Sequence, residues 1–64
     1  MSNNLNRSLE NTPSIIIVAW IEGIDQMTFV DRGREKDRAE FIAELRKRRA
    51  AGEINDHLAA KLGL

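Results

Sequence analysis

Four consecutive basic residues, Arg46, Lys47, Arg48 and Arg49, are the strongest chemical signal in the sequence. On a helix, such a run can bind the phosphates of nucleic acid with an affinity that falls as salt rises. However, four consecutive helical positions point around most of the helix, and bases near a helix end also stabilise its terminal carbonyl groups. The chain balances ten Lys and Arg against ten Asp and Glu, so net charge does not favour a nucleic-acid partner. We therefore predict a solvated helix end, with phosphate contact by these four residues as the alternative.

No group of residues suggests catalysis. His57 is the only histidine and the chain has no cysteine, which removes the usual ligands of structural zinc and the usual nucleophile pairs. The acids Glu22, Asp25 and Asp31 would need a pocket that separates their pKa values before they performed acid–base chemistry. No glycine-rich phosphate loop is present. We predict no catalytic residue, no metal site, no cofactor and no enzyme activity.

The C-terminal segment 54–64, INDHLAAKLGL, resembles the first helix and glycine turn of a helix-turn-helix motif. In that family the helix after the turn enters the major groove of DNA. This sequence ends before such a helix begins. The resemblance therefore implies the first helix and turn of the motif without the recognition helix that contacts DNA. DNA recognition by this route is therefore not expected.

The element that must organise any site is the apolar run 15–21, with sequence IIIVAWI. One interpretation is a helix with Thr12 as its cap, Pro13 at its first position and Gly23 just past its end. The other is a strand, because five of the seven residues are β-branched and such side chains lose rotamer freedom in a helix. We favour the strand. A polar interruption and a second run at 27–30 then predict a β-hairpin.

From residue 34 onward the spacing of apolar residues becomes helical. We predict a helix from about Glu35 to Ala51, ended by Gly52, because glycine enters the left-handed cap conformation at little cost. A second, shorter helix is predicted from His57 to Leu62, capped by Asn55 or Asp56 and closed by glycine. The long helix is expected to bury residues Ala39, Phe41, Ile42, Leu45 and Ala50 and to expose residues Glu40, Glu44, Arg46, Lys47 and Arg48.

The ends of the chain complete the domain organisation. Residues 1–13 are rich in Asn and Ser, and we expect a flexible N-terminal arm followed by one small domain over 14–64. The N-terminus lacks the apolar core of a signal peptide, and a run of seven apolar residues is far short of the roughly 20 that span a bilayer. A cytoplasmic protein without a membrane partner is expected.

The predicted fold class is α+β, a small ββαα protomer with a hairpin, one longer helix and one short C-terminal helix. A strand that is apolar on both faces must be covered on both sides, and two helices cover only one. We therefore predict an obligate homodimer or higher oligomer. Its interface is expected to comprise Ile15, Ile17, Ala19, Trp20 and Ile21.

The expected function is that of a small, non-enzymatic interaction or regulatory protein that binds itself and another protein. Its size and lack of catalytic motifs are similar to those of the small inhibitors and accessory factors of bacteria and their phages. A nucleic-acid-binding regulator that uses residues 46–49 is the alternative.

Overall fold

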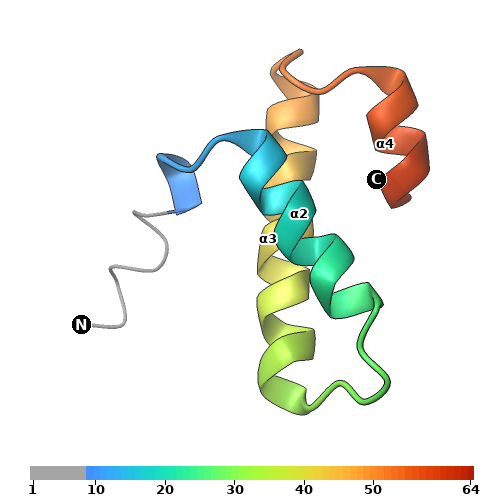
Figure 1. Ribbon diagram of the computed structural model, residues 1–64. Helices are drawn as coiled ribbons and strands as arrows, with labels where there is room; N and C mark the ends of the chain where they lie inside the picture. Colours follow the sequence, from blue (N-terminus) through green and yellow to red (C-terminus); the bar gives the residue numbers. More distant parts are fainter. Residues whose placement is uncertain (1–8) are drawn as a thin grey trace.

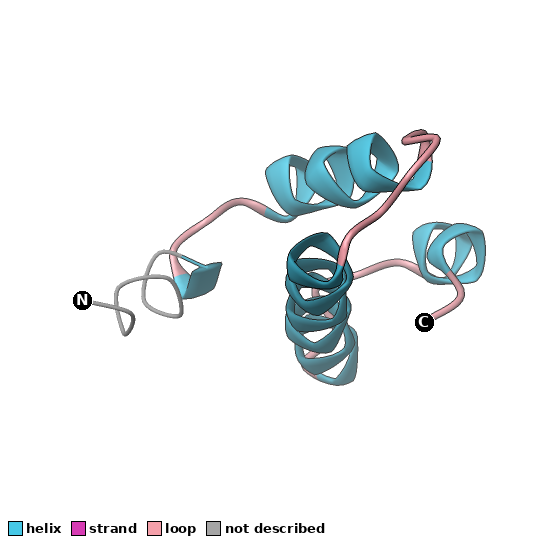
Figure 2. Cartoon of the chain, turned by 90° about the horizontal axis from the view of Figure 1, so that it is seen from below, coloured by secondary structure: helices cyan, strands magenta, loops and turns pink. Residues whose placement is uncertain are grey.

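The computed structural model describes residues 9–64, and Figure 1 shows their regular structure as helices. The three principal helices are α2 (Ser14–Asp25), α3 (Arg32–Ala50) and α4 (Asp56–Leu62). No strand occurs between residues 9 and 64, so the predicted α+β fold with its ββαα protomer is wrong. Helices α2 and α3 form the main packed pair. In Figure 2 α3 is seen nearly end-on, with α2 lying across it and α4 at its side.

The apolar run 15–21 lies in α2 and not in a strand. Helical folding places Ile17, Val18, Ile21 and Ile24 on one side, where all four are buried. A β-branched residue costs only a few tenths of a kcal/mol in helix propensity, roughly 0.7 at most, whereas burying such a side chain contributes about 1.5–3 kcal/mol. Burial of one helical face therefore outweighs the β preference of the individual residues.

The second predicted strand, 27–30, belongs to the connection between α2 and α3. The Met27 amide donates to the carbonyl oxygen of Ile24 at 3.1 Å, which continues the turn that ends α2. Val30 packs against the core, while the side chain of Phe29 is 79% exposed. With 15–21 helical, this segment has no strand to pair with, so the predicted hairpin is wrong.

Local caps define the ends of the other two helices. The side chain of Asp31 accepts a hydrogen bond from the Arg34 amide at 2.8 Å, so α3 begins earlier than the predicted Glu35. Gly52 follows α3 with a φ of 80°, as expected for a left-handed cap. The predicted short helix is confirmed: Asn55 accepts from the Leu58 amide at 2.7 Å, and Gly63 ends α4 with a φ of 72°.

The core lies where α2, α3 and α4 meet. Ile17, Ile21 and Leu45 are its largest fully buried side chains, and Phe41 is also buried. Ile42 packs partly against this core. The predicted buried face of α3 is wrong at two positions, because residues Ala39 and Ala50 are exposed.

The N-terminal arm was predicted over residues 1–13, and residues 1–8 lie outside the described part of the chain. Leu9 is buried in the core, and residues 9–10 are helical. The Thr12 amide donates to the carbonyl oxygen of Leu9 at 3.1 Å. This stretch therefore contributes to the packed domain.

Candidate protein interface

The surface most suited to binding is the side of α2 opposite its core side. Ile16, Ala19, Trp20 and Gly23 occupy positions i, i+3, i+4 and i+7, which share one face of a helix. Met27 continues this face four residues further on, just after α2 ends. All five residues are exposed, with Trp20 at 44%. We call these five residues the outer stripe.

A groove between α2 and α3 runs beside the outer stripe. Its volume is about 530 Å³, and its lining includes Trp20, Gly23, Met27, Arg34, Asp37 and Phe41. The ring of Trp20 lies on that of Phe41, with centroids 5.3 Å apart and planes tilted by 40°. This contact holds the indole in place while leaving much of it open. A rigid, half-exposed aromatic ring is the kind of group that anchors protein–protein contacts.

Gly23 leaves an opening in the middle of the outer stripe. It lies inside α2, where glycine costs roughly 1 kcal/mol relative to alanine. A Cβ atom added there would meet no atom within 4 Å, so nothing in the described chain requires glycine at this position. Glycine does permit another backbone to approach closely. The position therefore suits a helix packed against α2 from outside.

The rim of the groove carries one charge of each sign. Arg34 donates a weak hydrogen bond to the sulfur of Met27 at 3.5 Å. Across residues 9–64, neither Arg34 nor Asp37 forms an ion pair. Asp25 is engaged by Arg38 at 2.7 Å, and this hydrogen bond raises the pKa of Arg38 above its usual value. Arg34 and Asp37 are thus one cation and one anion at the rim that have no ion-pair partner among residues 9–64.

The predicted interface residues divide between two environments. Ile17 and Ile21 are fully buried inside the protomer. Ala19 and Trp20 belong to the outer stripe, and Ile15 is 75% exposed on α2 beside α4. Ile16, Gly23 and Met27 were missed, although their spacing with Ala19 and Trp20 is visible once the run is taken as helical.

The basic run does not form one surface. Arg48 is buried, so its predicted exposure is wrong. Its guanidinium donates to Glu44 at 2.8 Å, to the Ser14 hydroxyl at 2.8 Å and to the Leu9 carbonyl oxygen at 2.9 Å. Glu44 is itself nearly buried, against the prediction. Arg48 thus joins α3 to the start of α2 and to the segment before it.

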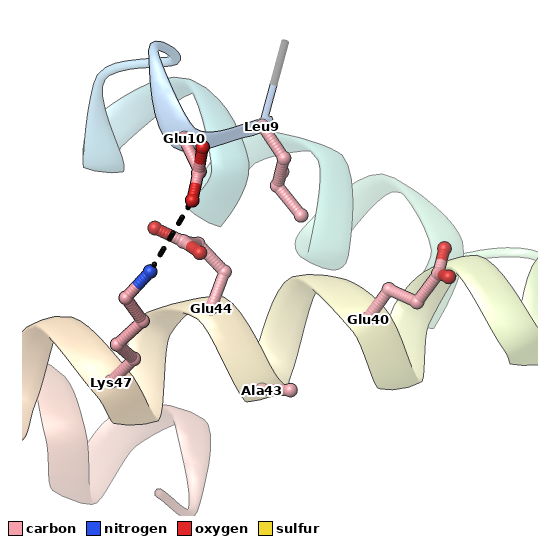
Figure 3. A pocket seen from close by; sticks show the side chains of 6 residues that line it. All are labelled: Leu9, Glu10, Glu40, Ala43, Glu44 and Lys47. Carbon is pink, nitrogen blue, oxygen red and sulfur yellow. Dashed lines mark ion pairs between the residues drawn. The ribbon is translucent and has the colours of Figure 1, made fainter. Parts of the chain in front are cut away.

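The other three basic residues have different contacts from one another. Lys47 pairs with Glu10 at 3.6 Å across a pocket of about 340 Å³, shown in Figure 3. Arg49 donates to the carbonyl oxygen of Leu64 at 2.8 Å, while Arg46 is exposed. Lys47 and Arg49 therefore contact Glu10 and Leu64, which lie near the two ends of the described residues, and Arg48 is the buried link between helices.

The other candidate residues have structural partners or lie apart. Glu22 pairs with Lys61 at 3.1 Å, Asp25 pairs with Arg38, and Asp31 caps α3. His57 is exposed. In the described part of the chain, no three His, Cys, Asp or Glu side chains lie together as metal ligands do. These three acids thus pair or cap helices, and none of them is placed for acid–base chemistry with another.

Comparison of the chain with protein-family models, curated proteins and solved structures gives no match. Between residues 9 and 64, no helix is both long enough and apolar enough to cross a membrane.

Proposed function

We propose that this is a small, non-enzymatic interaction protein that forms a homodimer through the outer stripe. The observation that supports this proposal is the exposed apolar face of α2 centred on Gly23. Contiguous exposed apolar surface of this kind commonly marks a protein interface. In the proposed dimer, two α2 helices cross at Ala19 and Gly23, with Ile16 and Trp20 packed on either side.

Three features favour a second copy as the partner. The rim carries both Arg34 and Asp37, so a two-fold axis would bring each cation of one chain toward an anion of the other. The formal net charge is zero, so two copies do not repel each other. The core is small and the chain has no disulfide, and domains of this size commonly gain stability from association.

The decisive variant is Gly23→Lys, examined by sedimentation equilibrium and circular dichroism. A lysine at this position meets open space in the protomer and favours the helix, but it blocks a second backbone. We expect wild-type dimers at micromolar concentration and a helical Gly23→Lys monomer. Ala39→Lys is the matched control, because it adds the same charge at an exposed position of α3, and it should remain dimeric.

Ile16→Glu, a second change in the outer stripe, guards against failure of the first variant to fold. It too should yield a helical monomer. A monomeric wild type at high micromolar concentration, or dimers that persist in both stripe variants, would contradict the proposal.

The alternative of nucleic-acid binding has less support, because Arg48 is buried and Arg49 binds the C-terminal carbonyl group. The cytoplasmic location expected from the sequence stays a prediction.

A further inference from the structure

A second apolar surface lies between α2 and α4. It is a groove of about 410 Å³ whose apolar lining is Ile15, Val18, Ile54 and Leu58. Its volume falls in the range of about 300–1,000 Å³ that is usual for ligand clefts. Ile15 is 75% exposed at its edge, one of the two most exposed large apolar side chains among residues 9–64. We call this surface the α2–α4 groove.

The α2–α4 groove is lined by residues other than those of the outer stripe. None of the five stripe residues lines it, and two of its apolar residues come from outside α2. Ile15 lies at the edge of the stripe, one turn before Ala19, whereas Val18 is on the buried side of α2. The floor of the groove therefore lies outside the stripe, and Ile15 is the residue where the two surfaces meet.

The charges around the groove indicate the chemistry of its occupant. Glu22 and Glu53 both line it, together with Lys61. Lys61 is engaged with Glu22 at 3.1 Å. Glu53 forms no ion pair with any residue from 9 to 64. The groove thus offers an apolar floor with one uncompensated carboxylate, which is complementary to aliphatic side chains followed by a cation.

We propose that the α2–α4 groove binds an amphipathic segment of another protein, with aliphatic residues on one face and a lysine or arginine that reaches Glu53. Such segments commonly dock as helices with anchors at i, i+3, i+4 and i+7. A second copy could occupy the groove through Phe29, the most exposed large apolar residue between 9 and 64. Such a contact closes a dimer if it is reciprocal and builds a chain if it is not, so in either case it appears as self-association.

The test is an NMR titration of isotope-labelled full-length protein with a short helical peptide that carries four leucines at this spacing and flanking lysines. Signals of Ile15, Ile54 and Leu58 should shift, with little change at Trp20 and Met27. A peptide with glutamates in place of the lysines should bind about tenfold more weakly, because Glu53 then repels it. A peptide with serines in place of the leucines should not bind.

Two exposed apolar residues provide a matched pair of variants. Ile15→Ser should weaken peptide binding about tenfold or more, whereas Phe29→Ser, at 79% exposure, should leave it unchanged. Glu53→Gln should remove most of the preference for lysine over glutamate peptides. Circular dichroism of each variant confirms that the helices are retained.

Several outcomes would overturn the inference: no shift at millimolar peptide, shifts centred on the outer stripe, or equal affinity for the lysine and glutamate peptides. Self-association of the Gly23→Lys variant that disappears when Phe29→Ser is added would instead assign the groove to a second copy. Peptide binding by the Gly23→Lys variant separates the two proposals, because the groove is expected to function in a monomer as well as in a dimer.

Discussion

The two sides of α2 have similar composition and opposite environments. The core side presents Ile17 and Ile21, which are fully buried, and the other side presents Ile16 and Trp20, which are each more than 40% exposed. A helix that is apolar all round normally lies inside a protein. Here α3 and α4 cover only one side of α2, and the uncovered side is the surface through which we propose dimerisation.

The two sides of α2 are expected to have different roles, one in the stability of the protomer and the other in its association. Residues on the core side contact the chain's own helices, so their substitution should unfold the protomer. Trp20 and Met27 contact α3, but the stripe residues Ile16, Ala19 and Gly23 are exposed, so their substitution should change association and leave the protomer folded.

The largest contrast is expected between Ile21→Asp and Ile16→Asp. Ile21 is fully buried, so a carboxylate there would be unpaired in the core and should abolish the folded state. Ile16→Asp places the same charge in solvent and should retain helical circular dichroism as a monomer. A folded Ile21→Asp variant would show that the core side is not the core of the protomer.

Arg48→Ala should destabilise the protein by about 3–5 kcal/mol, because it leaves the nearly buried Glu44 without its cation. It also releases the Ser14 hydroxyl at the start of α2. The control is Arg46→Ala, an exposed change two residues earlier, for which about 0.5 kcal/mol or less is expected. Urea denaturation followed by circular dichroism measures both, and equal effects would refute the role of Arg48 as a link.

The smallest expected change in stability comes from Gly23, which is compared with Ile24, its neighbour on the opposite side of α2. In the monomeric Ile16→Glu background, Gly23→Ala should raise the free energy of unfolding by roughly 1 kcal/mol through helix propensity. Ile24→Ala in the same background should lower it by about 2–5 kcal/mol, because Ile24 is buried. If Gly23→Ala were instead destabilising, the open space beside Gly23 would be filled by this chain itself.

Features that depend on nearby residues were predictable. The short helix, its closing glycine and the role of Gly52 after α3 are as expected, and Asn55 is the one of the two predicted cap residues that caps it. Each depends on interactions within about one helical turn, and such interactions have strong residue preferences. The strand predicted for 15–21 is wrong because β-branched residues favour a strand locally, whereas burial of one helical face against α3 depends on distant residues.

Features that depend on distant residues were not predictable. Arg48 is buried because it meets the backbone of Leu9 and the hydroxyl of Ser14, which are 39 and 34 residues away in the sequence. Nothing in the run Arg46 to Arg49 distinguishes the buried member from its neighbours. The α2–α4 groove likewise exists only because Ile15 and Leu58 are brought to the same surface.

By itself, the sequence determined where α3 and α4 end, because caps and left-handed glycines act over a few residues. The tertiary structure decided that 15–21 is helical and which of its side chains are buried, because burial against α3 contributes more free energy than β propensity removes. It therefore also decided that Ile16, Trp20 and Gly23 face outward, where a partner can reach them.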